Sequence, residues 1–534
     1  MTRPLSRAMA SVFPDAATQG FRVGMARYGL LLEGLEFQVV NRFIYTAVRA
    51  AGAPKGAKGP PPKFIFKVMT KIHPEIRRRL RTIAETWETK RWREDVALWD
   101  TKIKPTIARE NTELQSVDLR ALSDGRLAEH LKSCVEAARR ATIIHHTFNA
   151  TAMLPLGDFL VHVRQWTGLA PAAVLPLFRG VSRVSQGATE ELDALAKAIG
   201  ANTSVLDGDP ATVVDALASR TDAIGEAARR YLDTAGVRIA TGYDIADLTL
   251  AEMPGVIVEN IKSALSRRIT NEHKPDTSGA IREKVPAEHR AKFDELLEEA
   301  RLTYRMRDER GYNNDAWSAG IARRAYLEAG RRLVAAGRLH DAQHAVELTA
   351  DEVVSMLSGG SGRTADQAAA DAQYRQTHTS KDAPRFLGGT PSGPPPDDWL
   401  PEAAARSQRA VAIVLEEMFA ARDNQQSGAK ISGHAASPGE VVGIARLVLD
   451  PADMGRVRQG DVLITRSTAP SYNALLPLLS GIVTDRGGTL SHAAVVAREY
   501  GIPAVVGTGN ATELIRDGAR VRLDGARGTV EVLA

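Results

Sequence analysis

The chain has 534 residues, which is long enough for several domains with sizeable cores. Hydrophobic residues make up 44% of it and aromatic residues 5%, a composition typical of a soluble, helix-rich globular protein. The 69 basic and 64 acidic residues nearly balance, and no basic stripe interleaved with aromatic side chains is present, so we expect no nucleic-acid partner.

Cysteine content and hydropathy limit the setting of the protein. Cys134 is the only cysteine, which excludes internal disulfides and cysteine-based metal clusters and fits a reducing compartment. No apolar run approaches the roughly twenty residues of a membrane span. The first twenty residues are interrupted by Pro4 and Pro14 and lack the apolar core of a signal peptide. We therefore expect a cytoplasmic protein without a membrane partner.

The N-terminal part of the chain is predicted to be mostly helical. Residues 21–49 are largely apolar with four leucines close together, and we expect a helix there. Residues 75–100 alternate charged and apolar side chains at helical spacing, and 127–147 form another amphipathic helix. The three tryptophans within 75–100 fit either helix-packing positions or the wall of an aromatic pocket.

The helix over 127–147 ends in two adjacent histidines, His145 and His146. Adjacent residues lie about 100° apart on a helix, so the two rings cannot both face one metal ion. We therefore expect no metal site on this chain. His145 is a candidate base that faces a ligand, and a core or surface position without a chemical role is the alternative.

A charged run lies inside the long helical stretch predicted over 293–333. Arg307 and Arg310 are three residues apart and share a helical face, so both can meet one phosphate group. Asp308 or Glu309 can accept a proton from a substrate hydroxyl. A solvated charged helix with internal ion pairs is the alternative interpretation.

Residues 358–398 are rich in Gly, Ser, Pro and small polar residues, which predicts a linker that runs over the surface. A helix is expected to follow over 400–421. A domain that must visit two separate sites needs a joint of this kind.

A strand–turn–helix pattern stands near the C-terminus. The apolar, β-branched run 480–484 predicts a buried strand, and a pair of glycines after it permits a sharp turn. Ser491 occupies the N-cap position of a helix predicted over 492–500. His492 thus falls in the first helical turn, beside unpaired backbone N–H groups and the positive end of the helix dipole.

That position gives His492 a specific chemistry. The positive helix end disfavours the imidazolium form and leaves a neutral nucleophile at about pH 7. If the ring accepts a phosphoryl group, the same N–H groups can hold the phosphate oxygens. The alternative is a histidine that merely caps the helix of an ordinary βαβ unit.

The string from Gly487 to Gly507 resembles the phosphohistidine segment of the swivelling domain shared by phosphoenolpyruvate synthase, pyruvate phosphate dikinase and rifampicin phosphotransferase. Residues 433–439 and 443–446 resemble the opening of that domain, and Thr468-Ala469-Pro470 resembles its loop facing the histidine. The resemblance implies a C-terminal α/β swivelling domain over 429–534, in which His492 carries a phosphoryl group between two distant sites. The residues that it implies around the histidine are Gly487, Gly488, Thr489, Ser491 and Thr468.

The helical part is similar to the central region of rifampicin phosphotransferase-like enzymes. Gly236-Val237-Arg238 and Asp244 match a motif there, although Tyr243 stands where those enzymes have a glutamate. The resemblance implies a large, mainly α-helical acceptor-binding domain over 1–357, joined to the swivelling domain by a linker and connecting helix over 358–428. The candidates for phosphoryl or substrate contacts in this domain are Arg238, Arg307, Arg310, Asp308, Glu309 and His145.

Two features of these families have no counterpart in the sequence. Nothing resembles the ATP-grasp unit with which the dikinases begin, and there is no P-loop of the form Gly-x-x-x-x-Gly-Lys-Ser/Thr. The chain also ends at Ala534, directly after the swivelling domain. This layout resembles the histidine-bearing subunit of phenylphosphate synthase and of the cresol-phosphorylating enzymes, which act in aromatic compound degradation.

That resemblance implies a multi-subunit, ATP-dependent phosphotransferase. A separate ATP-grasp subunit would bind ATP and Mg²⁺ and release AMP and phosphate, and this chain would hold no tightly bound cofactor. His492 would pass the phosphoryl group to a phenol or a cresol. An antibiotic or aliphatic alcohol as acceptor, and a non-catalytic phosphocarrier or regulatory module, are the alternatives.

Overall fold

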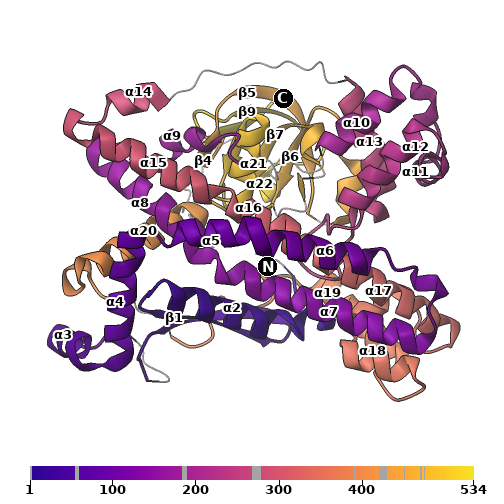
Figure 1. The fold of residues 1–534 in the computed structure, drawn as a ribbon. Coiled ribbons are helices and arrows are strands. Elements are labelled where there is room, and N and C mark those ends of the chain that lie inside the picture. Colours follow the sequence, from indigo (N-terminus) through magenta and orange to yellow (C-terminus); the bar gives the residue numbers. More distant parts are fainter. Residues whose placement is uncertain are drawn as a thin grey trace. The chain divides into compact units, whose positions relative to one another are not determined.

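The computed structural model describes residues 3–54, 59–182, 189–266, 278–389, 393–419, 430–449, 451–468, 472–473 and 475–533. The chain forms two compact units, which Figure 1 shows coloured along the sequence. Unit 1 comprises 1–154, 244–246 and 313–409, and unit 2 comprises 155–243, 247–312 and 410–534. The units follow from contacts and do not decide the predicted domain limits at 357 and 428, which stay predictions.

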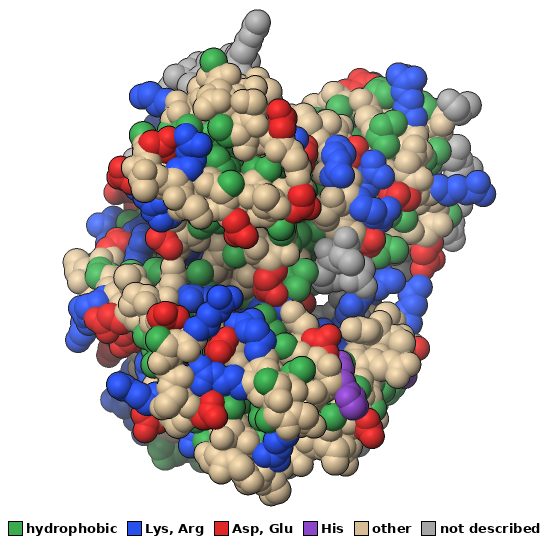
Figure 2. Space-filling model, turned by 90° about the vertical axis from the view of Figure 1, so that its right-hand side faces the viewer, with side chains coloured by type: hydrophobic (Ala, Val, Ile, Leu, Met, Phe, Trp, Pro, Cys, Tyr) green, Lys and Arg blue, Asp and Glu red, His purple; other side chains and the backbone are tan. Residues whose placement is uncertain are grey.

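The predicted fold class is confirmed, since a mainly helical region precedes a C-terminal α/β domain. Basic and acidic side chains are interspersed on the face shown in Figure 2, as the near balance of charges suggests. Among the described residues, no helix combines the length and the apolar character that crossing a membrane requires.

Unit 1 is built on three helices and a β-hairpin. Helix α7 (Asp124–Thr147) packs against α2 (Phe13–Arg27) and α17 (Trp317–Ala335), and α2 also packs on the hairpin of β1 (Leu32–Val40) and β2 (Phe43–Ala50). The other helices within unit 1 are α1 (Arg7–Ala10), α3 (Lys63–Ile72), α4 (Pro74–Thr89), α5 (Trp92–Leu98), η1 (Trp99–Ile103), α6 (Lys104–Gln115), η2 (Leu119–Ala121), η10 (Ala342–Glu347), α18 (Ala350–Leu357), α19 (Ala365–Thr377) and η11 (Asp397–Trp399).

The β-hairpin corrects the prediction of a helix over 21–49. The helix ends at Arg27, and the rest of the segment pairs as antiparallel strands. Asn41 and Arg42 form the turn with φ of 47° and 69°, the left-handed conformation that a two-residue hairpin turn requires. The strands on both sides are rich in aromatic and β-branched residues, which favour a pleated surface over a helix.

Helix α19 lies within the segment predicted as a surface linker. The Thr364 side chain and Gln367 form a capping box that starts this helix. Ala368 and Ala372 are buried on the side of α19 that packs against η10. The segment 358–398 is therefore partly folded, and residues 390–392 within it lie outside the described residues.

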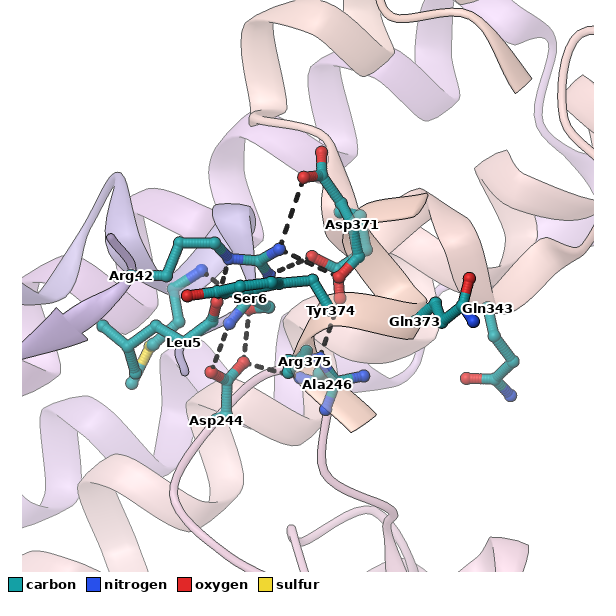
Figure 3. Close-up of polar contacts among 12 residues, drawn as sticks. Leu5, Ser6, Arg42, Asp244, Ala246, Gln343, Asp371, Gln373, Tyr374 and Arg375 are labelled. Atoms are coloured by element: carbon teal, nitrogen blue, oxygen red, sulfur yellow. Dashed lines mark hydrogen bonds and ion pairs between the residues drawn. The ribbon is translucent and has the colours of Figure 1, made fainter. Parts of the chain in front are cut away.

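Figure 3 shows the polar network that fixes these elements of unit 1. Arg42 Nε donates to Leu5 O at 2.6 Å, Arg42 Nη1 donates to the backbone oxygen of Asp371 at 3.0 Å, and the same guanidinium pairs with the buried Glu347. Asp244 accepts hydrogen bonds from the backbone N–H and the hydroxyl of Ser6 and from Ala246 N. Because these contacts occupy its carboxylate, Asp244 has a structural role.

Unit 2 contains an eight-stranded mixed sheet of order β3-β10-β9-β5-β6-β7-β8-β4. The pairs β5–β6, β6–β7 and β7–β8 are parallel, and the remaining pairs are antiparallel. The strands are β3 (Lys430–Ser432), β4 (His434–Ser437), β5 (Glu440–Leu447), β6 (Asp461–Thr465), β7 (Leu479–Thr484), β8 (Ala504–Val506), β9 (Arg520–Asp524) and β10 (Thr529–Val532).

Helices α21 (His492–Tyr500) and α22 (Ala511–Leu514) cover opposite faces of this sheet. Leu463 and Ile482 share an apolar cluster with α21, whereas the next residues of the same strands, Ile464 and Val483, share one with α22. Successive side chains of a strand point to opposite faces, so the two clusters lie on the two sides.

The helical part of unit 2 extends the apolar cluster on the α21 side. Side chains of α10 to α13 belong to the same cluster as α21, and Ser263 Oγ of α13 donates to Pro477 O at 2.8 Å. The helices within unit 2, apart from α21 and α22, are α9 (Pro171–Val174), η3 (Leu175–Phe178), α10 (Thr189–Ile199), η5 (Thr203–Leu206), α11 (Pro210–Ser219), α12 (Ala223–Tyr231), η6 (Leu232–Gly236), η7 (Leu250–Glu252), α13 (Pro254–Ser266), α14 (Ser278–Glu283), η8 (Ala287–His289), α15 (Arg290–Tyr304), α16 (Met306–Arg310), η12 (Pro451–Arg456) and η14 (Leu476–Leu478). Three further helices, α8 (Asn149–Thr167), η9 (Gly311–Ala316) and α20 (Glu402–Phe419), contribute residues to both units.

Candidate functional site around His492

The loop between β7 and α21 holds His492 at the start of its helix. Ser491 is the N-cap residue, with φ of −64° and ψ of 160°, and Gly501 ends the helix in the left-handed conformation, as the sequence predicts. Gly487 has a φ of +104°, and a Cβ added there would lie 2.6 Å from the Cβ of Ser491. The turn that presents His492 therefore requires glycine at position 487.

Thr468 contacts the ring of His492 from the neighbouring strand. Strands β6 and β7 are parallel, so the loops after their carboxyl ends meet at one edge of the sheet. Thr468 Oγ1 lies 3.0 Å from His492 Nδ1. When Nδ1–H donates to this hydroxyl, the lone pair is on Nε2, which becomes the nucleophilic nitrogen. The next two residues of the predicted loop, 469 and 470, lie outside the described residues.

Arg307 of α16 reaches the same loop from the helical part of unit 2. Its Nη2 donates to Leu490 O at 2.7 Å. Within the described part of the chain, the buried Arg307 Nη1 and Ser491 Oγ have no hydrogen-bond partner. A guanidinium N–H and a hydroxyl that lack hydrogen-bond partners and lie beside an imidazole can bind the oxygens of a phosphoryl group.

The surroundings of His492 keep its ring neutral. Burial and, as the smaller cause, the positive charge of Arg307 together lower the pKa of His492 to about 3. The imidazole is therefore unprotonated at neutral pH, the form in which a ring nitrogen attacks phosphorus.

The other charged residues of α16 have different contacts. Arg310 is buried, and its Nε donates to Met306 O at 2.8 Å, while Glu309 pairs with Arg305 at 3.0 Å. These pairs match the alternative interpretation of a helix with internal contacts. Arg307 contacts the histidine loop, and the joint phosphate contact predicted for Arg307 and Arg310 stays a prediction.

Arg238 also lies in unit 2, where its guanidinium stacks over the Tyr312 ring at 4.3 Å from the centroid. It is buried, and burial lowers its pKa. Arg238 therefore has a cation–π partner within the helical part, and its predicted substrate contact stays a prediction.

His145 lies in unit 1, with its Nδ1 2.7 Å from Asp315 Oδ2. Its ring lies edge-on to that of the neighbouring His146, with 4.9 Å between the ring centroids, and His146 also stacks on Phe21 and contacts Asn149. Among the described residues, no three His, Cys, Asp or Glu side chains are grouped so that they could hold a metal ion.

Two acidic residues that the sequence analysis did not single out lie in or against the histidine segment: Glu499 belongs to α21, and Glu417 contacts Thr489. Glu499 accepts a hydrogen bond from Gly180 N at 2.8 Å, and burial together with the charge of Asp308 raises its pKa to about 7. Glu417 of α20 accepts a hydrogen bond from the Thr489 hydroxyl, and burial raises its pKa. Each of these two residues is distant in sequence from its hydrogen-bond partner. No local motif therefore points to either contact.

Comparison with known protein families locates both sides of the site. Residues 457–528 match the PEP-utilising enzyme, mobile domain, and residues 145–314 match the rifampicin phosphotransferase fourth domain. The first segment contains His492, and the second contains Arg307. The chain thus contains two segments that are similar to domains of PEP-utilising phosphotransferases. The candidate residues of the helical part all fall within the second segment.

Several relatives of this chain carry enzyme names. An uncharacterized phosphotransferase YvkC of Bacillus subtilis (strain 168) is 28% identical over 313 residues, which cover 57% of this chain and 36% of that protein. A rifampicin phosphotransferase of a Streptomyces species is 49% identical over 113 residues, 21% of this chain and 13% of its own. A probable phosphoenolpyruvate synthase of Staphylothermus marinus is 47% identical over 102 residues, 19% of this chain and 12% of its own. The chain thus spans little more than a third of the first relative and far less of the others.

Proposed function

We propose that this chain is the phosphohistidine-carrying and acceptor-binding part of an ATP-dependent, dikinase-type phosphotransferase. His492 takes the β-phosphoryl group of ATP, with one water consumed and AMP and phosphate released. A separate ATP-grasp subunit holds ATP and Mg²⁺ during this step. The loaded histidine then passes the phosphoryl group to the hydroxyl of a small substrate.

One observation carries the proposal: a neutral histidine at a helix N-terminus faces an arginine with an unused N–H group. Thr468 engages His492 Nδ1, which leaves Nε2 to form the N–P bond as the bond from phosphorus to the leaving oxygen breaks. Arg307 Nη1 and Ser491 Oγ are suited to hold the transferred oxygens. Phosphoryl transfer depends mainly on positioning and charge stabilisation, which these groups supply.

In the second half of the reaction, the acceptor oxygen attacks phosphorus and the N–P bond breaks. The hydroxyl proton passes to a base, for which Asp308, Glu309 and His145 are our candidates. A phenol or a cresol suits this step because its hydroxyl, with a pKa of about 10 like tyrosine, needs little help from a base. We take such a phenol as the acceptor.

A hydroxyl of an antibiotic is the second candidate acceptor. Two observations favour it: residues 145–314 match a rifampicin phosphotransferase domain, and a Streptomyces relative bears that name. The same residues would serve either acceptor, so a substrate comparison separates the two. A non-catalytic phosphocarrier needs no acceptor site. A phosphorylated product formed from either the phenol or the antibiotic would exclude a non-catalytic phosphocarrier.

The test of the proposal is transfer of label from β-³²P-ATP to the chain in the presence of an ATP-grasp protein encoded beside it. We expect acid-labile label on the native chain and none on His492→Ala. His340→Ala, which removes an exposed histidine of unit 1, is the matched control and should label fully. Full labelling of His492→Ala would place the carrier elsewhere and overturn the proposal.

A further inference from the structure

The last turn of helix α20 is hydrogen-bonded to the phosphohistidine loop, residues 487–491, which precedes His492. Gly488 N donates to Met418 O at 3.2 Å, and Leu490 N donates to Glu417 O at 2.8 Å. Between these two bonds, the Thr489 hydroxyl donates to the carboxylate of Glu417. Three consecutive loop residues therefore contact two consecutive residues of the helix end.

These bonds occupy groups that a phosphoryl group would use. N–H groups of a glycine-bearing loop before a helix are typical ligands of phosphate oxygens. Here the N–H groups of Gly488 and Leu490 donate to main-chain oxygens of α20 instead. The arrangement belongs to the unloaded state of the loop, because an incoming phosphoryl group would compete with Glu417 and Met418 for it.

Glu417 is suited to respond to the charge of that group. Its side chain is half-buried, and burial raises its pKa, so its carboxylate is already poorly solvated. A phosphoryl group on His492 adds negative charge three residues from Thr489, and like charges in a poorly solvated region repel strongly. The neighbouring Glu416 is exposed and offers a comparison within the same helical turn.

We propose that the end of α20 is a latch on the phosphohistidine loop, closed by Glu417 and Thr489, which slows access to His492 in the unloaded chain and is held open by the charge of the phosphoryl group once the histidine is loaded. The latch rests on the proposed function, and it adds a means of regulating the same site. Helix α20 is the last described element before the sheet domain begins at Lys430. Opening the latch would free the loop N–H groups.

The first experiment measures the latch without phosphorylation. Hydrogen–deuterium exchange of the loop peptide is compared in the native chain, Glu417→Ala, Glu417→Gln and the matched control Glu416→Ala. We expect exchange about tenfold faster in Glu417→Ala, because a charge-assisted hydrogen bond is lost, a smaller increase in Glu417→Gln and none in the control. Equal exchange in Glu417→Ala and Glu416→Ala would overturn the latch. Glu417→Gln keeps the side-chain size and serves if Glu417→Ala does not fold.

The second experiment measures access to His492 with phosphoramidate as a small phosphoryl donor. Nε2 attacks phosphorus, the P–N bond of the donor breaks, and ammonia leaves. We expect labelling of Glu417→Ala to be faster than that of Glu416→Ala by the factor seen in exchange. Faster exchange with an unchanged rate of labelling would show that the latch does not limit access to His492, and this would overturn the proposal. Failure of every variant to label at His492 would instead count against the proposed function, and the exchange comparison would still decide the latch.

Discussion

The chemistry of the site depends on one imidazole being kept neutral beside an arginine. Burial is the larger cause of the low pKa of His492, and Arg307 adds to it. The arginine that disfavours a proton on the ring favours a phosphoryl group there, because that group is negative. Burial thus keeps the nitrogen unprotonated for its attack, and the arginine stabilises the transferred group.

This pair predicts a pH dependence. Because the pKa of His492 is about 3, the ring is neutral from about pH 5 to about pH 8, and the labelling rate should show no histidine titration there. In Arg307→Ala the pKa should rise but stay below its ordinary value, since burial remains. The measurement is the rate of labelling by phosphoramidate against pH, divided by the rate of N-acetylhistidine amide. A loss of normalised rate centred at about pH 6.5 in the native chain would contradict the prediction.

The same low pKa affects stability with a definite sign. In the unfolded chain His492 binds a proton below its ordinary pKa of 6.5, whereas in the folded chain it does so near 3. Its contribution to the free energy of unfolding is therefore complete above 6.5 and decreases as the pH falls from 6.5 toward 3.

Substitution of Arg307 should separate the two half-reactions. In Arg307→Ala, we expect loading of His492 by the ATP-grasp partner to be spared and delivery to the acceptor to slow by about a hundredfold, as when one donor to a transition-state oxygen is removed. Single-turnover decay of the labelled chain with and without acceptor measures this. Arg305→Ala, in the same segment but paired with Glu309, is the control. Equal loss of both half-reactions would remove Arg307 from the acceptor step.

The sequence predicted the site to the extent that its signals are local. Ser491, His492 and the glycine at 487 follow one another within a single strand–turn–helix, so their geometry is given by turn and cap chemistry. Arg307 was reached through a charged run, but its contact with Leu490 depends on packing between distant segments. Glu417 carries no local signal, because it meets Thr489 across 72 positions of sequence.

At the scale of elements, periodicity and turn chemistry gave opposing indications in the N-terminal region. The leucines at 30–35 suggested a helix, yet the alternating residues and the turn at Asn41 and Arg42 produce a hairpin. The segment 358–398 was predicted as a linker from its composition, whereas a capping box and buried alanines make α19 within it. In both places a few residues decide the local structure. The average composition of the surrounding segment suggests a different structure.

The glycine turn before α21 gives an element-scale prediction. Gly487→Ala would force a side chain into a φ of +104° and against Ser491, which should lower the free energy of unfolding by about 1 to 3 kcal/mol and displace His492. Urea unfolding of the native chain and the variant, together with labelling at His492, measures both effects. Gly455→Ala in the same domain, where an added Cβ would meet no atom within 4 Å, is the control. Equal stability of both variants would show that the turn relaxes.

At the scale of the whole molecule, the matches to known families cover two separate segments of the chain. The mobile-domain match covers 457–528 and the fourth-domain match covers 145–314, and the hydrogen bond from Arg307 to Leu490 O joins them within unit 2. Unit 1 is fixed by its own polar network, in which Arg42 and Asp244 are fully engaged. The proposed separate source of the phosphoryl group is open to a direct test.

The partner is tested by AMP formation. We expect the chain alone, with ATP, Mg²⁺ and phenol, to release no AMP, because the sequence contains neither a P-loop nor an ATP-grasp segment. With the ATP-grasp protein present, AMP and phenyl phosphate should form in equal amounts, and His492→Ala should abolish both. Replacing phenol by a rifamycin decides between the two acceptors, since the preferred one gives the faster AMP release at equal concentration. Tight binding of ATP to this chain alone, measured by calorimetry, would contradict the separate-subunit scheme while leaving the role of His492 to the labelling experiment.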